Sequence, residues 1–178
     1  MAAEQNLLHA TSSNKDAKFF AIGAMFLFFA AFEGYLNWLG NRIAPEIWKD
    51  ERQFFSRSPF QGTLGKYRFL ATILHISNPD PSQGPFQTAN DLLELRNMVA
   101  HPKAEAGEKQ AKFAEGYFPP LHESELSKKV SPKKALRAKN HLKELADELH
   151  REAKLAYPSN VHESDAFGSL LGATVTDV

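Results

Sequence analysis

The sequence predicts an all-α protein, and three observations support that prediction. Apolar residues recur at helical spacing in each segment with a clear pattern, no stretch of useful length alternates as a strand would, and prolines and glycines separate the periodic segments. The chain has 178 residues, enough for one domain with a sizeable core. We therefore expect a single bundle of four to five helices.

The first predicted helix is the apolar run FFAIGAMFLFFAAFEGYLNWLG, residues 19 to 40. Asn14 or Asp16 can cap its start, because short polar side chains accept hydrogen bonds from the free N–H groups of a first turn. Gly40-Asn41 suits a left-handed end to the same helix. The prediction is therefore a helix that begins after Asn14 or Asp16 and ends near Gly40-Asn41.

This run also raises the question of a membrane span. Its unbroken apolar part stops at Phe32, short of the roughly 20 residues that a span needs, and Glu33 follows. Counting on through Trp38 restores that length, so a membrane helix stays open as the alternative, although a carboxylate within a span is costly. A helix that is apolar on all sides is otherwise enclosed by neighbours, in a bundle or a dimer interface. We expect the bundle, with no membrane.

Three further helices are expected in the middle of the chain. A proline suited to a first turn predicts a short helix over 45–55, and apolar spacing predicts a helix over 64–76. A third starts at Thr88 or Asn90 and ends before Pro102, because the residue before a proline is disfavoured in helical conformation.

The last predicted helix starts at Ser131-Pro132, a serine cap followed by a proline in the first turn, and continues to Pro158. Its expected apolar seam consists of Leu136, Leu142, Leu145, Leu149 and Leu155. The predicted organisation is a flexible polar leader over 1–14, a helical domain over 15–157 and a loosely ordered tail over 158–178. The leader lacks the features of a secretory signal.

Composition excludes several classes of function. Lysine plus arginine total 21 and aspartate plus glutamate total 21, so no overall charge attracts nucleic acid or an anionic membrane. The chain has no cysteine, which removes disulfides and thiolate chemistry and is compatible with a cytoplasmic location. No histidine pair has the spacing of a recognised metal site, and no glycine-rich phosphate loop or serine nucleophile elbow is present. We expect neither a metal nor another cofactor.

The most informative stretch is LLELRNMVAHP, residues 92 to 102. On a helix, Leu92, Leu95 and Val99 form one apolar stripe, and Arg96 falls about 40 degrees from Leu92, within that stripe. An arginine there can extend its charged end outward along the surface. If its guanidinium is instead partly buried, it requires an acidic or phosphate partner.

Glu33 is a candidate for that partner. A single carboxylate in an apolar helix and a single arginine in an apolar stripe are each costly, and pairing them removes both costs. We therefore expect the two helices to pack so that Glu33, or Asn37 one turn further on, positions Arg96.

His101 stands where Pro102 ends the predicted helix. The free carbonyls of a helix end favour an imidazolium, and the ordinary pKa range of histidine suits proton transfer. Asn97 lies four residues earlier on the same face and can orient the ring. The alternative interpretation is a histidine that only caps the helix, above a solvated asparagine.

The order of these elements resembles the HEPN superfamily, small all-helical domains of prokaryotic toxin, abortive-infection and RNA-processing proteins. The family motif is an arginine, a polar residue and, at the end of the helix, a histidine, which corresponds to Arg96-Asn97-Met98-Val99-Ala100-His101. FFAAFEGYLNWLG is similar to the early helix of the family and LGKYRFL to its lysine-bearing middle helix. The resemblance covers roughly residues 16 to 156 and implies a HEPN-like fold.

The activity that this resemblance implies is metal-independent RNA cleavage that leaves a 2′,3′-cyclic phosphate and a 5′-hydroxyl. His101 would act as general base or acid, Arg96 would stabilise the charge of the pentavalent phosphate, and Asn97 would orient phosphate or histidine. The implied setting is toxin action, antiphage defence or stress response. Other members of the family are inactive and bind nucleotide, RNA or a protein partner, which is the alternative function.

The resemblance also implies a homodimer, in which two motifs face one composite cleft, and a possible antitoxin or protein partner. Family toxins that a nucleotidyltransferase silences carry a tyrosine two places after the histidine, where this chain has Lys103. Regulation by adenylylation at that position is therefore not expected.

A cluster of cations near the last predicted helix is the expected RNA-binding surface. From Lys128 to Lys143 the chain has no acidic residue. The predicted RNA-binding residues are Lys128, Lys129, Lys133, Lys134 and Arg137. The alternative is an ordinary solvated helix face, although cations at a helix start oppose the helix dipole.

Overall fold

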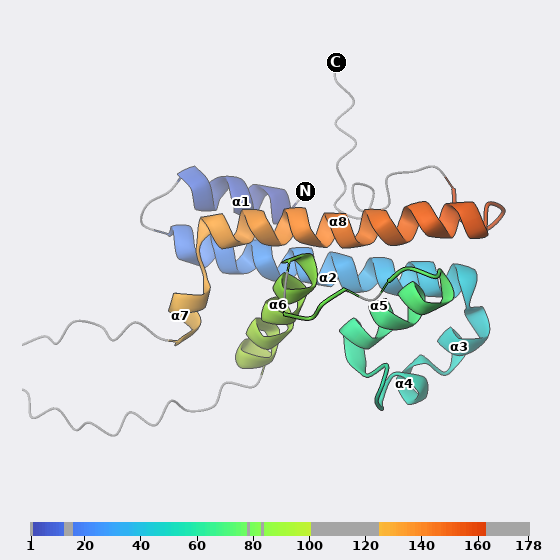
Figure 1. Ribbon diagram of the computed structural model, residues 1–178. Coiled ribbons are helices and arrows are strands. Elements are labelled where there is room, and N and C mark those ends of the chain that lie inside the picture. Colours follow the sequence, from blue (N-terminus) through green and yellow to red (C-terminus); the bar gives the residue numbers. More distant parts are fainter. Residues whose placement is uncertain (1, 13–15, 78, 83, 101–124, 163–178) are drawn as a thin grey trace, which may run out of the picture.

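The computed structural model of the chain describes residues 2–12, 16–77, 79–82, 84–100 and 125–162 (Figure 1). Within these ranges all regular structure is helical, which confirms the predicted all-α class. The helices are α1 (Ala2–Ser12), α2 (Ala17–Ile43), α3 (Pro45–Lys49), α4 (Glu51–Phe54), α5 (Gly62–Ile73), α6 (Gly84–Ala100), α7 (Glu125–Lys129) and α8 (Pro132–Ala156). Five of them are longer than five residues and form the bundle.

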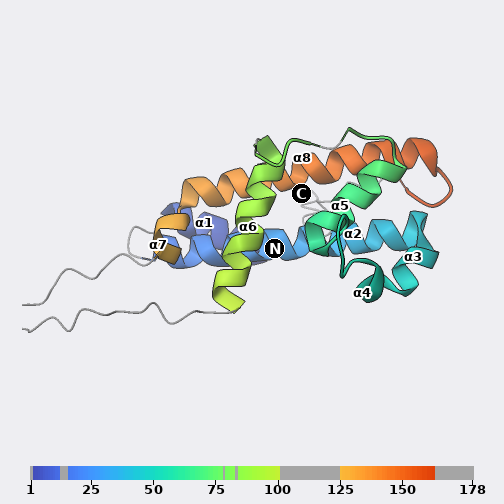
Figure 2. The same ribbon diagram turned by 60° about the horizontal axis from the view of Figure 1, so that its bottom comes forward.

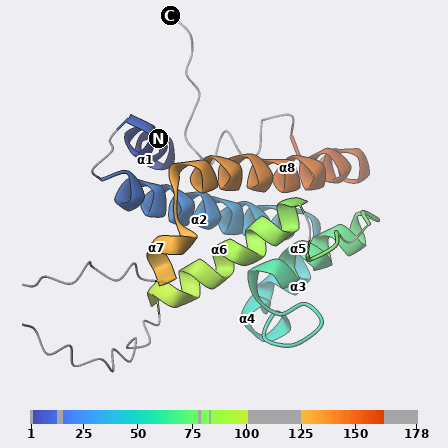
Figure 3. The same ribbon diagram turned by 60° about the vertical axis from the view of Figure 1, so that its left-hand side comes forward.

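Helices α2 and α8 form the axis of the molecule, because they lie side by side along most of their length (Figure 1). α1 packs against both at one end, and α5 with the short α3 and α4 lies at the other end of α2. α6 crosses the α2–α8 pair obliquely, as the turned view shows (Figure 2). α7 lies beside α6 and joins onto the start of α8 (Figure 3).

The structure differs from the sequence prediction at the beginning of the chain, where a leader was expected over 1–14. Ala2–Ser12 form a helix instead, and Ala3, Leu7 and Ala10 are buried in the core. Their spacing is that of one narrow helical face, so a segment of polar composition still buries an apolar edge against α2. Asp16 takes the N-cap position of α2, but its side chain makes no capping hydrogen bond.

α2 continues past Gly40 to Ile43, so the predicted left-handed end at Gly40-Asn41 is wrong. Gly40 has another role: a Cβ atom built there would lie 2.1 Å from the indole ring of Trp48. The glycine therefore lets the α3 tryptophan pack directly on the backbone of α2. The chain then turns into α3 at Pro45, as predicted, while Asp50 separates α3 from α4 within the single helix expected over 45–55.

The apolar run of α2 forms the centre of the core. Phe28, Phe32, Tyr35, Leu36 and Leu39 are all fully buried. In the described part of the chain α2 is the one helix that is long and apolar enough to cross a membrane, judged by length and composition alone. The core helix of a soluble bundle meets the same criteria, and 44% of the most apolar stretch of α2 is buried in this fold.

α8 begins as predicted, with the Ser131 hydroxyl accepting a 3.2 Å hydrogen bond from the Lys134 backbone N–H and Pro132 in the first turn. Its buried seam is Ala135, Ala138, Leu142, Leu145, Ala146, Leu149 and Ala153. Leu136 and Leu155, both predicted for the seam, are 46% and 73% exposed. Four of the seven buried seam residues are alanines, and their small side chains allow α8 to pack closely against α2.

Helix α6 begins at Gly84, four residues before the expected Thr88. Its described part ends at Ala100, so the predicted stop at Pro102 lies outside the described residues. His101 also lies outside them.

Candidate functional site

Glu33 of α2 and Arg96 of α6, which the sequence predicted to lie together, line the same hollow of 230 Å³. We name it the first hollow. Its walls come from α2, from α4 with the turn after it, from the start of α5 and from α6. The lining residues are Glu33, Glu51, Arg52, Phe55, Gly62, Thr63, Lys66, Leu93 and Arg96.

Lys66 forms the deepest charged group of the first hollow. The residue is only 6% exposed, and its Nζ donates to Asn37 Oδ1 over 2.7 Å and to Glu51 Oε1 over 2.8 Å. The ammonium also lies 5.8 Å from the centroid of the Phe55 ring. A buried charge is costly unless it is paired and hydrogen-bonded, and these contacts meet that requirement.

Two glycines explain why the chain presents Lys66 in this way. Gly62 has φ +67, a conformation that an L side chain rarely adopts, and its N–H donates to the Phe55 carbonyl over 2.9 Å. A Cβ atom at Gly65 would lie 1.9 Å from the Phe60 carbonyl oxygen. The turn before α5 therefore folds tightly onto the helix, which directs Lys66 inward toward α2.

Glu33 contacts α5 rather than α6. Its Oε1 accepts a 2.9 Å hydrogen bond from the Thr63 hydroxyl, and the side chain is half-buried. Among the described residues no ion pair joins Glu33 to Arg96, although both line the first hollow. Asn37, one turn further along α2, accepts from Lys66 and more weakly from Trp48 Nε1 at 3.4 Å.

Arg96 and Asn97 are exposed on α6. Of the two interpretations given for Arg96, the structure agrees with the first, in which the charged end extends outward along the surface. Arg96 and Leu93 both line the first hollow. Arg52 also lines this hollow and is exposed. Neither arginine has an ion pair or hydrogen bond within the described ranges of the chain.

The charges of the first hollow favour an anion. Three cations, Arg52, Lys66 and Arg96, face two carboxylates, Glu33 and Glu51, which leaves one positive charge. Lys66 is neutralised by its partner, whereas both guanidinium groups are available. Guanidinium groups recognise phosphate and carboxylate oxygens through paired N–H donors.

The predicted RNA-binding residues occupy a different place. Lys129, Lys134 and Arg137 line a second hollow, of 220 Å³, on the other flank of α6. Its other lining residues are Met25, Thr88, Asp91, Leu92, Leu95 and Ala138. Lys128 and Lys133 are exposed but do not line it.

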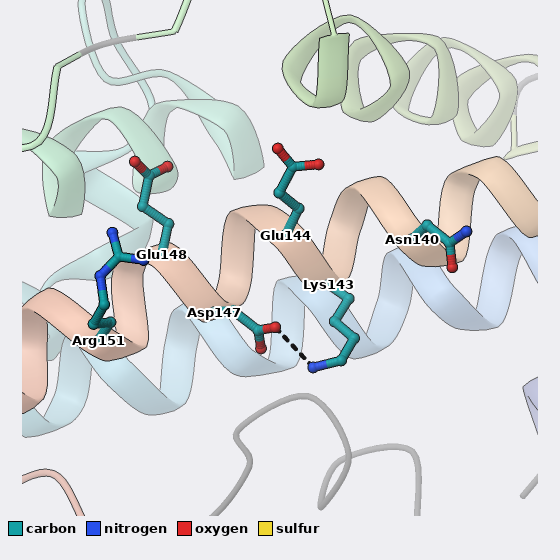
Figure 4. Close-up of a pocket in the computed structure, with 6 residues that line it drawn as sticks. All are labelled: Asn140, Lys143, Glu144, Asp147, Glu148 and Arg151. Atoms are coloured by element: carbon teal, nitrogen blue, oxygen red, sulfur yellow. Dashed lines mark hydrogen bonds and ion pairs between the residues drawn. The ribbon is translucent and has the colours of Figure 1, made fainter.

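A third hollow, of 520 Å³, follows the outer surface of α8 between Asn140 and Arg151 (Figure 4). Its six lining residues all belong to one helix, and Glu144 and Glu148 point away from the Lys143–Asp147 pair. Side chains on one convex helix surface do not converge on a ligand as the walls of a pocket do. This hollow therefore provides no candidate site.

Within the described ranges, no group of three or more histidine, aspartate and glutamate side chains could hold a metal ion.

The sequence did not reveal Thr63, Glu51 and Arg52 as members of the first hollow. Lys66 carried a usable signal, because it is a cation within a stretch that also contains the apolar Leu64, Tyr67 and Leu70.

Comparisons of the chain with protein-family models, with curated proteins and with solved structures found no match.

Proposed function

We propose that the protein is a metal-independent endoribonuclease of the HEPN type, and that Arg96, Asn97 and His101 form its catalytic centre. The observation that supports the proposal is the first hollow, which Arg96, without an ion pair among the described residues, lines together with a half-buried Glu33 and a buried Lys66. His101 follows Arg96 by five residues in the sequence, directly after the last described residue of α6.

The reaction is a transfer of the phosphoryl group within the RNA. The ribose 2′-oxygen forms a bond to the adjacent phosphorus, the bond from phosphorus to the 5′-oxygen breaks, and a 2′,3′-cyclic phosphate and a 5′-hydroxyl result. His101 takes the proton from the 2′-hydroxyl or supplies one to the leaving 5′-oxygen, depending on which subunit contributes it. Arg96 stabilises the charge that develops on the phosphate oxygens, and Asn97 orients the phosphate or the histidine.

Glu33 and Asn37 are the supporting residues of this centre. Glu33 bonds Thr63 and Asn37 bonds Lys66, so both residues fix α5 to α2 next to the hollow. Their role would be to hold α5 in place beside the hollow that Arg96 lines, which matters because catalysis depends on placement within about 0.5 Å.

The proposal includes a homodimer in the cytoplasm. Phe19 and Leu27 of α2 are 73% and 38% exposed, and Val99, three residues after Arg96, is 42% exposed. Exposed large apolar side chains of this kind suit an interface between two copies. A second subunit would bring a second Arg96 and His101 to the same cleft, and the setting would be toxin action, antiphage defence or stress response.

The decisive experiment incubates the purified protein with total RNA in EDTA. We expect cleavage with 2′,3′-cyclic phosphate ends, and a loss of about 10²- to 10³-fold in rate for Arg96→Ala and at least as much for His101→Ala. The matched control is Arg151→Ala, because Arg151 is an exposed arginine on α8 that pairs with Glu152, away from the first hollow.

Cleavage that persists in both variants would point to a contaminating nuclease and would remove the assignment. RNA binding without cleavage by the wild-type protein would instead support the alternative, an inactive HEPN-like domain that binds nucleotide, RNA or a protein partner.

A further inference from the structure

Arg52 is a cation of the first hollow that the proposed reaction does not use. It belongs to α4, is exposed and lines the hollow together with Arg96 of α6. Within the described ranges, neither side chain takes part in an ion pair, a hydrogen bond or a contact with an aromatic ring. The first hollow therefore presents guanidinium groups from two separate helices to one space of 230 Å³.

The two carboxylates of the first hollow have partners of their own. Glu51 Oε1 accepts from the buried Lys66 ammonium over 2.8 Å, and Glu33 Oε1 accepts from the Thr63 hydroxyl over 2.9 Å. Neither acid forms an ion pair with Arg52 in the part of the chain that the structure describes. Arg52 is therefore without a counter-charge among the described residues, and its paired N–H donors match the oxygens of a phosphate.

Contacts on both sides of Arg52 fix the part of the chain that presents it. Glu51, the residue before it, is held by Lys66, and Phe55, three residues after it, is only 5% exposed. The Phe55 carbonyl also accepts a 2.9 Å hydrogen bond from the Gly62 N–H. Because α4 is only four residues long, these flanking contacts, rather than the helix itself, hold the backbone of Arg52 beside the hollow.

Arg52 and Arg96 belong to helices that do not pack closely on each other. Of the helices, α4 packs mainly against α3, whereas α6 packs on α2, α7 and α8, and Figure 1 shows α4 and α6 apart. The first hollow is smaller than the roughly 300 Å³ at which pockets for drug-sized ligands begin, so it suits part of a single strand rather than a duplex. A phosphate bound to Arg96 therefore leaves Arg52 for a second anionic group of the same ligand.

In an RNA strand the second anionic group is the next phosphate, one ribose away from the scissile phosphate. We propose that Arg52 binds this neighbouring phosphate while Arg96 binds the scissile one. Arg52 touches no reacting atom in this arrangement, so its role is to bind and place the substrate. This inference rests on the proposed function, and it narrows the substrate class to RNA with a phosphate group beside the scissile phosphodiester.

The test compares kcat/KM for the dinucleotide UpA, which has only the scissile phosphate, with kcat/KM for the same dinucleotide carrying a 3′-terminal or a 5′-terminal phosphate. We expect the wild-type protein to cleave one of the two phosphorylated forms about tenfold faster than UpA, the gain typical of one charge-assisted contact. Arg52→Ala should remove that gain and leave the cleavage of UpA unchanged. Arg52→Lys should keep part of the gain, because lysine retains the charge but not the paired donors.

The matched control is Arg57→Ala, which removes an exposed arginine that follows α4 and does not line the first hollow. It should leave all three rates unchanged. A gain that persists in Arg52→Ala would overturn the inference, and so would equal wild-type rates for the three substrates. A loss of the same size with UpA would also overturn it, because Arg52 would then act on the scissile phosphate itself.

Cytidine 3′,5′-bisphosphate, which contains no phosphodiester to cleave, tests the same contact apart from the reaction. If the wild-type protein cleaves no RNA, the proposed function fails, but calorimetry should still show about tenfold tighter binding of the bisphosphate than of either cytidine monophosphate. Arg52→Ala should abolish that difference, whereas Arg57→Ala should preserve it. Equal affinities of the wild-type protein for the bisphosphate and the monophosphates would contradict the proposal.

Discussion

Lys66 Nζ donates a 2.7 Å hydrogen bond to Asn37 Oδ1, and through that bond a buried cation of α5 is fixed to the C-terminal half of α2. The same asparagine oxygen also receives Trp48 Nε1 of α3 at 3.4 Å. One side-chain amide therefore connects three helices, one of which presents Lys66 to the first hollow, and the stability of this region should depend on it.

Replacing Lys66 by methionine should lower the free energy of unfolding by about 2 kcal/mol, because Glu51 and Asn37 each lose a partner in a largely buried place. The control is Lys49→Met, which breaks a 2.7 Å ion pair with Glu46 on the surface and should cost less than about 0.5 kcal/mol. Urea unfolding followed by circular dichroism measures both. Equal costs would mean that the Lys66 contacts do not stabilise the fold.

Gly65→Ala should destabilise the protein by more than about 2 kcal/mol, because the new Cβ would collide with the backbone carbonyl of Phe60, which cannot move aside as a side chain can. Gly34→Ala is the matched control within α2, where a Cβ meets nothing within 4 Å. There the helix propensity of alanine should raise the free energy of unfolding by about 0.5 to 1 kcal/mol. Thermal unfolding of the two variants should shift the midpoint in opposite directions.

Tyr35 and Tyr67 provide a second matched pair. The Tyr35 hydroxyl is buried without a hydrogen-bond partner among the described residues, so Tyr35→Phe should leave the free energy of unfolding unchanged or raise it by about 1 kcal/mol. The Tyr67 hydroxyl donates to Glu148 Oε2 at 3.5 Å, so Tyr67→Phe should lower it by about 0.5 kcal/mol. A large loss for Tyr35→Phe in chemical unfolding would show that its hydroxyl is bonded.

Stability should fall at alkaline pH because of the same two residues. Burial raises the pKa of the Tyr35 hydroxyl above its usual 10.0, and the Asp147 carboxylate adds to the rise. Burial also raises the pKa of Tyr67, with the Glu148 carboxylate adding to the rise. The folded protein holds both protons after the unfolded chain has released them, so stability is complete below about pH 10 and declines above it.

Ultraviolet absorbance of tyrosinate measures this effect. Two tyrosines should titrate only as the protein unfolds, and the double variant Tyr35→Phe/Tyr67→Phe should lose less stability between neutral and alkaline pH than the wild type does. An equal decline in both proteins would contradict the interpretation.

Features governed by local chemistry could be predicted from the sequence. The start of α8 follows from Ser131 and Pro132, since a serine cap and a first-turn proline act within one turn. Gly40 was misinterpreted because its role depends on Trp48, which a local rule does not see. The helix over Ala2–Ser12 was missed because its stability comes from packing on α2 and from the Lys139–Glu4 ion pair with α8.

The same division applies to the candidate site. Glu33 and Arg96 were noticeable because each is a charge within an apolar pattern, and such a charge needs a partner or a ligand. Lys66 was noted only as the lysine of the LGKYRFL segment. Their actual partners could not be predicted, because Thr63 and Glu51 come from segments whose approach depends on the tight turn at Gly62 and Gly65. HEPN-type catalysis, the homodimer and the cytoplasmic location stay predictions.

The pairing of α2 with α8 has a consequence for the order of events during synthesis. α1 and α2 are neighbours in sequence and can associate early through short-range contacts, whereas residues 44–131 separate α2 from α8. Until α8 leaves the ribosome, α2 lacks the cover that α8 gives it in the folded protein. We therefore expect the nascent chain to pass through a stage with exposed apolar surface, at which it is prone to aggregation.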